Sequence, residues 1–123
     1  MSAWSRGASV LFLLGTLVTP VLTGAQKPAP VSDPVLERQF AQTVRPFVEE
    51  FCTGCHSGAQ PEAQFNLKSF ATLSSVLDDL PHWTLLMERL NHQEMPPDSE
   101  PQPSARLRQQ VIDWVKAVRA NEL

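Results

Sequence analysis

Apolar residues recur at helical spacing in three stretches of the chain, and no stretch alternates convincingly in the manner of a half-buried strand. The positions are Phe40, Val44, Phe47, Val48 and Phe51 in the first stretch, Trp83, Leu86, Met87 and Leu90 in the second, and Leu107, Val111, Trp114, Val115 and Val118 in the third. Because this spacing places side chains on one face of a helix, the pattern predicts an all-α fold.

The first helical region is predicted to run from about residue 35 to residue 51, with one complication at Pro46. A proline removes a backbone hydrogen bond to the preceding turn of a helix. We therefore expect two pieces, in which Thr43 caps the second piece and Pro46 lies in its first turn, where proline is tolerated.

Prolines and cap residues also set the expected ends of the later helices. A short helix is predicted from Ser69, as its cap, to Asp79. Pro81 begins the helix that carries the second stripe, and the last helix begins near Ser104. Residues 96–104 contain four prolines, so they cannot be helical throughout.

The first 25 residues have the composition of an export signal. A basic residue precedes an apolar run from Ala8 to Leu22, and small residues follow that run. The run is short for a membrane span, so we expect residues 1–25 to be a cleaved signal peptide, with an uncleaved anchor as the alternative. Residues 26–34 hold three prolines and are expected to form a flexible leader, which leaves residues 35–123 as one domain.

The segment Cys52-Thr53-Gly54-Cys55-His56 has the C-x-x-C-H pattern at which a haem is attached covalently. Two cysteines three positions apart can bond to the two vinyl-derived edges of a porphyrin, and the following histidine can then ligate the iron. In bacteria this attachment takes place outside the cytoplasmic membrane, in agreement with an export signal. The expected cofactor is one haem c with its iron, held by Cys52 and Cys55 and ligated by His56.

Three other kinds of site could use the same cysteines. A thioredoxin-like redox pair needs βαβ surroundings, and this chain is predicted to be helical. A zinc site would need two further histidines, but His82 and His92 are ten residues apart, which is not a usual spacing for such a pair. A disulfide between Cys52 and Cys55 would close too short a loop to stabilise the fold much.

The sixth ligand of the iron can be a methionine, a histidine or no side chain at all. Met87 lies on the apolar face of a predicted helix, so core packing accounts for it. Met95 follows the end of that helix and precedes Pro96, which favours an extended backbone at Met95. We therefore predict that Met95 is the distal ligand, with His92, His82 or an open site as the alternatives.

The charge of the chain limits its partners. The formal net charge is −3, and without the predicted signal peptide nine basic residues face thirteen acidic ones, which gives −4. Because no basic stripe is present, nucleic acid is not an expected partner. We expect a monomer that docks transiently with redox proteins, and membrane association only if the N-terminal segment is not cleaved.

From Arg45 to Asn121 the chain resembles the small class I-type cytochrome c domain known as planctomycete type, which also occurs in acidobacterial secreted proteins. The matching segments are Val44-Arg45-Pro46-Phe47, Cys52-Thr53-Gly54-Cys55-His56, Phe65-Asn66-Leu67-Lys68-Ser69-Phe70, Trp83-x-x-x-Met87-x-x-Leu90, Glu94-Met95-Pro96-Pro97 and Trp114. The resemblance implies a fold in which the first and last helices pack around one covalently bound haem. It also implies that Cys52 and Cys55 attach the haem, with His56 as proximal and Met95 as distal ligand.

These observations predict a periplasmic or secreted c-type cytochrome that carries single electrons and is not an enzyme. In the family that it resembles, the domain often belongs to much longer proteins, whereas this sequence stops at Leu123. A free-standing carrier and an electron-delivery domain truncated from a larger protein are therefore both open. The alternative of another class is an open-site haem enzyme or ligand sensor, such as a peroxidase.

Overall fold

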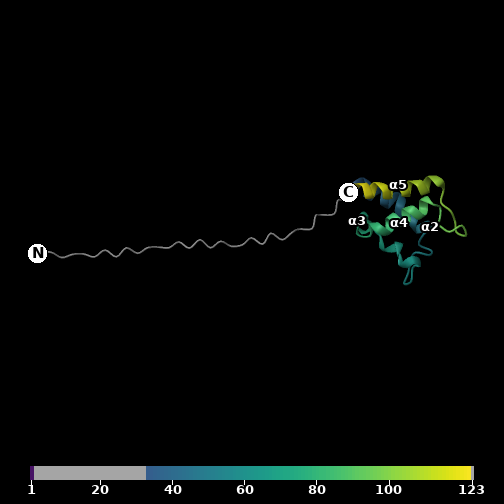
Figure 1. The fold of residues 1–123 in the computed structure, drawn as a ribbon, viewed down its shortest axis with the longest axis horizontal. Coiled ribbons are helices and arrows are strands. Elements are labelled where there is room, and N and C mark those ends of the chain that lie inside the picture. Colours follow the sequence, from purple (N-terminus) through teal and green to yellow (C-terminus); the bar gives the residue numbers. More distant parts are fainter. Residues whose placement is uncertain (2–32, 123) are drawn as a thin grey trace.

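The computed structural model describes Met1 and residues 33–122, and every regular element in that part of the chain is a helix (Figure 1). The elements are α1 (Pro34–Gln39), the π-helix η1 (Phe40–Val44), α2 (Arg45–Phe51), the 3-10 helices η2 (Glu62–Gln64) and η3 (Leu67–Ser69), α3 (Leu73–Asp78), α4 (Leu80–Asn91) and α5 (Ala105–Asn121). The predicted all-α class is thus confirmed. No helix among the described residues is long and apolar enough to cross a membrane.

The predicted signal peptide, residues 1–25, lies outside the described residues apart from Met1. The predicted leader, residues 26–34, also lies outside them apart from its last two residues. Those two residues belong to the first helix, because Asp33 is its N-cap and Pro34 its first residue. The Asp33 carboxylate accepts hydrogen bonds from the backbone N–H groups of Val35 and Leu36, at 2.8 and 3.1 Å.

The elements α1, η1 and α2 follow one another without a break, and this corrects one expectation. Thr43 does not cap a separate helix, because Val44 and Arg45 both keep helical backbone angles. The chain instead forms a π-helical turn, in which the N–H of Arg45 bonds to the carbonyl of Phe40, five residues back. We infer that this wider turn accommodates Pro46, which has no N–H to donate to the preceding turn.

The start of α3 also differs from the expectation. Ser69 ends η3, and the N-cap of α3 is Thr72, whose hydroxyl accepts a hydrogen bond from the backbone N–H of Ser75. The Ser75 hydroxyl in turn accepts from the N–H of Thr72 at 3.1 Å, which completes a capping box. The next N–H, that of Leu73, donates to the Glu37 carboxylate at 2.9 Å and so joins α3 to α1.

The last helix packs against the N-terminal segment, as expected, and also against α4. It begins after Ser104, whose hydroxyl accepts from the N–H of Leu107 at 3.2 Å. Near its middle, the indole N–H of Trp114 donates to the carbonyl of Leu36 in α1 at 3.0 Å. This bond joins the first and last helices inside the core, where the Phe40 and Trp114 rings also lie 5.5 Å apart.

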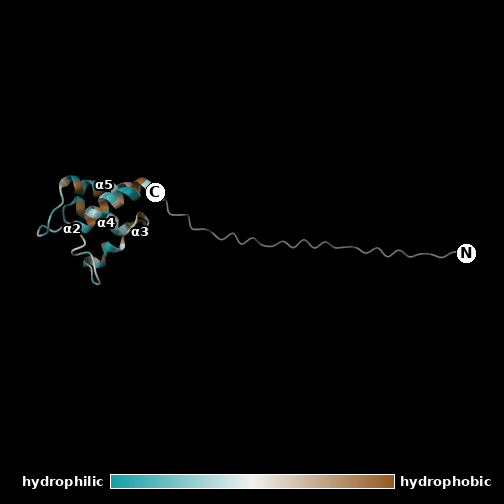
Figure 2. Ribbon diagram, turned by 180° about the vertical axis from the view of Figure 1, so that it is seen from behind, coloured by the Kyte–Doolittle hydropathy of each residue, from teal (hydrophilic) through white to brown (hydrophobic). Residues whose placement is uncertain are grey.

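The core consists mostly of residues from the three predicted apolar stripes, joined by α3 and its approach, by Leu36 in α1 and by Ile112 in α5. Its buried side chains are Leu36, Phe40, Val44, Phe47, Val48, Leu67, Leu73, Val76, Trp83, Met87, Leu90, Val111, Ile112, Trp114, Val115 and Val118. In Figure 2, α5 carries both brown and teal segments along its length, as a helix with one buried face should. The prediction that Met87 is a core residue is confirmed, since 7% of it is exposed.

Candidate haem site

The two cysteines and the histidine of the motif lie in one compact turn at the end of α2. Cys52 is the C-cap of that helix, and its own carbonyl accepts hydrogen bonds from the N–H groups of Cys55 and His56, at 3.2 and 2.9 Å. The turn is tied back to α2 by the Thr53 hydroxyl, which donates to the Glu49 carbonyl at 3.0 Å. A rigid helix thus leads directly into the turn that carries both thiols.

His56 is oriented by the loop that follows it. Its Nδ1 lies 3.0 Å from the carbonyl oxygen of Glu62. Because a carbonyl oxygen can only accept, Nδ1 carries the proton in this hydrogen bond, and Nε2 then holds the lone pair that binds a metal. Two backbone bonds hold the same loop against the motif, from Glu62 N–H to the Cys55 carbonyl and from Leu67 N–H to the His56 carbonyl. This is the arrangement that fixes a metal-binding imidazole in one tautomer and one orientation.

The two thiols differ in their surroundings and are not joined in a disulfide. Cys52 is half-buried and packs against the core, whereas Cys55 is exposed. Burial raises the pKa of the Cys52 thiol to about 12, because an apolar environment disfavours the thiolate.

Met95 lies on a separate segment, the loop between α4 and α5. Its side chain is 38% exposed, while the next residue, Pro96, is buried. The loop is fixed from α5, since the Arg108 guanidinium donates to the carbonyl of Met95 at 2.6 Å. The structure therefore brings three of the four predicted site residues into one turn and holds the fourth on a restrained loop.

The alternative histidine ligands have other surroundings. The Nδ1 of His82 lies 2.6 Å from an Asp79 carboxylate oxygen, and the His82 ring stacks on Phe65 at 5.2 Å. His92 is the exposed C-cap residue of α4. Both histidines are exposed.

Two features beside His56 fit a large apolar group that carries acceptor oxygens, as a haem with its two carboxylates does. The indole Nε1 of Trp83 is buried and has no hydrogen-bond partner among the described residues. The ring of Phe65 lies between Trp83 and His56. Its centroid is 6.5 Å from that of the Trp83 ring and 6.3 Å from that of the His56 ring. Half-buried apolar side chains, among them Phe65 and Phe70, line the core nearby. An unpaired buried donor calls for a partner that the described residues do not supply.

Comparison with known proteins agrees with the motif. A model of the planctomycete cytochrome C family matches residues 52–99, a segment that begins at Cys52 and includes Met95. This match confirms the resemblance to planctomycete-type cytochrome c. No curated protein and no solved structure gives a significant match.

A cytochrome c of this type binds haem c through the two cysteines of its motif, and both are present here. The competing kinds of site find less support in residues 33–122. No strand is present there to form a thioredoxin-like βαβ unit. Within the same residues, no three His, Cys, Asp or Glu side chains are grouped so that they could hold a metal ion by themselves.

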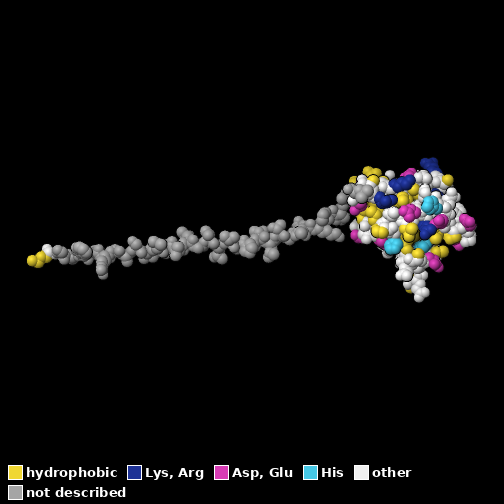
Figure 3. All heavy atoms as spheres, viewed as in Figure 1, with side chains coloured by type: hydrophobic (Ala, Val, Ile, Leu, Met, Phe, Trp, Pro, Cys, Tyr) yellow, Lys and Arg dark blue, Asp and Glu magenta, His cyan; other side chains and the backbone are white. Residues whose placement is uncertain are grey.

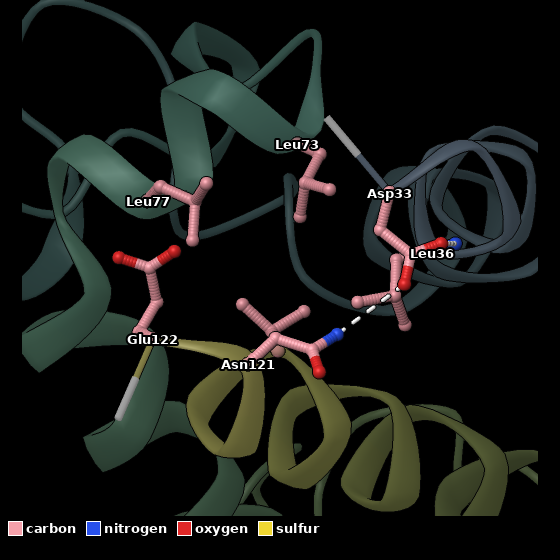
Figure 4. A pocket seen from close by; sticks show the side chains of 7 residues that line it. Asp33, Leu36, Leu73, Leu77, Asn121 and Glu122 are labelled. Carbon is pink, nitrogen blue, oxygen red and sulfur yellow. Dashed lines mark hydrogen bonds between the residues drawn. The ribbon is translucent and has the colours of Figure 1, made fainter. Parts of the chain in front are cut away.

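Two cavities in the described part of the chain lie away from the motif. One, of about 10 Å³, lies between α1, α3 and the end of α5, where Asn121 donates a hydrogen bond to Asp33 at 3.3 Å (Figure 4). The other, of about 280 Å³, lies between the N-terminal helical segment and α5. Its lining residues are Gln39, Thr43, Val44, Gln110, Asp113, Trp114 and Ala117. Neither cavity is lined by a predicted site residue.

Sequence reasoning missed three contributors to this region. The carbonyl of Glu62 belongs to the backbone and leaves no mark in the sequence. Trp83 was recognised only as a core residue, because its apolar spacing hides an unpaired N–H. The contact of Arg108 with Met95 spans thirteen positions in sequence, and no local pattern signals it.

Proposed function

We propose that this protein is an exported one-electron carrier whose single haem is attached to Cys52 and Cys55 and ligated by His56 and Met95. The observation that carries the proposal is the state of His56. Its Nδ1 donates to the carbonyl of Glu62, and its Nε2 is thereby prepared to bind a metal beside the two thiols. The family match over residues 52–99 supports a c-type cytochrome.

Each residue has a distinct task in this proposal. The two cysteines fix the cofactor covalently, so it cannot dissociate between encounters with partners. His56 supplies an imidazole nitrogen, and Met95 supplies a thioether, a soft ligand that favours the ferrous state. The apolar side chains around the motif exclude water, which also disfavours the extra positive charge of ferric iron. When bound, the haem supplies a redox centre whose iron alternates between the ferrous and ferric states.

Export and partner choice belong to the same proposal. The apolar run within residues 1–25 supports translocation of the chain before the haem is attached. On the face shown in Figure 3, basic, acidic and apolar side chains are interspersed, and neither charge sign dominates. This surface suits brief contacts with redox proteins better than a single permanent partner.

Met95 and Met87, the two methionines that follow the predicted signal peptide, provide a matched test of the distal ligand. Met95→Leu should leave the haem attached but remove the weak far-red absorption band of a ferric methionine–iron bond, and it should open the iron to cyanide. Met87→Leu conserves volume in the core and should keep that band. The ligand assignment is wrong if Met95→Leu retains the wild-type spectrum. A wild-type protein that binds cyanide as tightly as Met95→Leu does would instead favour the haem enzyme or ligand sensor.

A further inference from the structure

The loop that carries Met95 is held by a few backbone hydrogen bonds, such as that from the Glu100 N–H to the Pro97 carbonyl at 2.9 Å, and by a network of side chains. The Nη1 atom of Arg108 donates to the carbonyl of Met95 at 2.6 Å and lies 3.4 Å from the carbonyl of Leu90, near the end of α4. Its Nη2 donates to the side-chain oxygen of Gln102 at 2.9 Å. The guanidinium of one residue thus joins α5, the end of α4 and the backbone of Met95.

Gln102 extends the same network along the loop. Its amide nitrogen lies 3.2, 2.8 and 3.1 Å from the carbonyl oxygens of Pro96, Pro97 and Glu100. An amide group has two protons to donate, so these three carbonyls share them. Arg108 fixes the other end of the Gln102 side chain, because it donates to the amide oxygen.

The sequence of the loop explains why such a network is needed. Pro96 and Pro97 have no N–H, so this part of the backbone has few donors of its own with which to close turns. The segment just before Met95 is held from α4, where Arg89 forms an ion pair with Glu94 and accepts the Glu94 N–H at its carbonyl. That ion pair is exposed to water, however, and such pairs contribute little. Arg108 is half-buried, and a hydrogen bond from a charged donor is among the stronger ones.

We propose that Arg108, supported by Gln102, is the positioning residue that keeps the Met95 thioether on the iron. The inference rests on the proposed function, because it takes Met95 to be the distal ligand. Arg108 forms its hydrogen bond with the backbone carbonyl of Met95, so it acts on the conformation of the loop and not on the sulfur. Loss of the guanidinium lowers the fraction of molecules in which the loop holds Met95 in position to ligate the iron. The apparent affinity of the iron for a competing ligand then rises in proportion.

The test measures the strength of the methionine–iron bond in the ferric protein matured with its haem. In Arg108→Ala, cyanide should bind about tenfold more tightly than in the wild type, as expected from the loss of a charged hydrogen bond. The far-red band should disappear at a lower temperature, while the reduced c-type spectrum stays unchanged. Gln102→Ala should change the cyanide affinity and the temperature at which the band is lost in the same direction, but by less. In the double variant, the two changes should be smaller than the sum of the single-variant effects, because both side chains belong to one network.

Two controls separate a positioning role from a general loss of stability. Arg106→Ala removes an exposed arginine two positions away on the same helix and should behave as the wild type. Val118→Ala opens a cavity far along α5, so it should lower the unfolding temperature without changing cyanide affinity. Arg108→Lys keeps a cation but not the forked guanidinium. Its cyanide affinity should therefore lie between those of Arg108→Ala and the wild type.

Unchanged cyanide affinity and far-red band in Arg108→Ala would overturn the positioning role while leaving the proposed function intact. If that variant does not fold, the same result in Arg108→Lys and Gln102→Ala overturns it. If the wild type itself lacks the far-red band, Met95 is not the ligand, and both proposals about this loop are wrong.

Discussion

Individual residues in this protein are distinguished by the partners of their polar atoms. His56 has one nitrogen engaged with a backbone carbonyl, Trp114 donates to Leu36, and Trp83 has a buried N–H with no partner among the described residues. A buried donor without a partner is costly, because it loses its bonds to water. The unpaired indole is therefore the residue-scale feature that most directly points to a bound group.

The two tryptophans give a matched prediction. If the Trp83 N–H donates to a haem carboxylate, it offsets negative charge near the iron, so Trp83→Phe should lower the reduction potential. Trp114→Phe loses a hydrogen bond within the protein and should cost about 1 kcal/mol of stability, but it should leave the potential unchanged. Redox titration and thermal unfolding of both variants check this. Equal potentials in the two variants would contradict the role given to Trp83.

The thiols give a second prediction, for the chain before haem attachment. Because burial raises the Cys52 pKa to about 12, from an ordinary value of 9.0, Cys55 should be alkylated first at pH 8. At this pH the thiolate fraction of Cys52 is about 1000-fold lower than that of a thiol with the ordinary pKa. The difference should shrink as the pH rises towards 12, and it should vanish in denaturant. Mass spectrometry of peptides after timed alkylation measures both rates, and equal rates in the folded chain would contradict the shielding of the Cys52 thiol by the core.

At the scale of elements, the helices were predictable but their junctions were not. The apolar stripes predicted the helices that became α2, α4 and α5, and the last helix was correctly expected to begin near Ser104, which is its N-cap. The π-helical turn before Pro46 could not be read from the sequence, because spacing alone does not distinguish a break in a helix from a widened turn. Thr72 and Ser69 both resemble caps, and only the reciprocal bond with Ser75 favours Thr72.

The cap of α3 can be tested directly. Thr72→Ala should destabilise the protein by about 1 kcal/mol, because the N–H of Ser75 loses its acceptor. Ser74→Ala, at an exposed position inside the same helix, should be neutral or slightly stabilising. Chemical denaturation of the two variants provides the comparison. A larger loss in Ser74→Ala than in Thr72→Ala would show that the cap is assigned to the wrong residue.

At the scale of the whole molecule, the sequence predicted the residues of the haem site better than the distant residues that surround them and hold them in place. Cys52, Cys55 and His56 are adjacent in sequence, so their proximity follows from a turn of local backbone. The supports of the site come from distant segments, since Phe65 and Trp83 extend the cluster at His56 and Arg108 reaches the Met95 loop from α5. Contacts of this kind depend on how the helices pack, and no local pattern in the sequence specifies them.

The central claim is that one haem is covalently attached and ligated by His56 and Met95. Its most direct test is the absorption spectrum of the protein matured in a host with haem-attachment machinery, recorded oxidised and then reduced. We expect a reduced α-band of c type together with a weak far-red band in the ferric state. A c-type spectrum without the far-red band would contradict Met95 as ligand, and a protein without haem would contradict the claim as a whole.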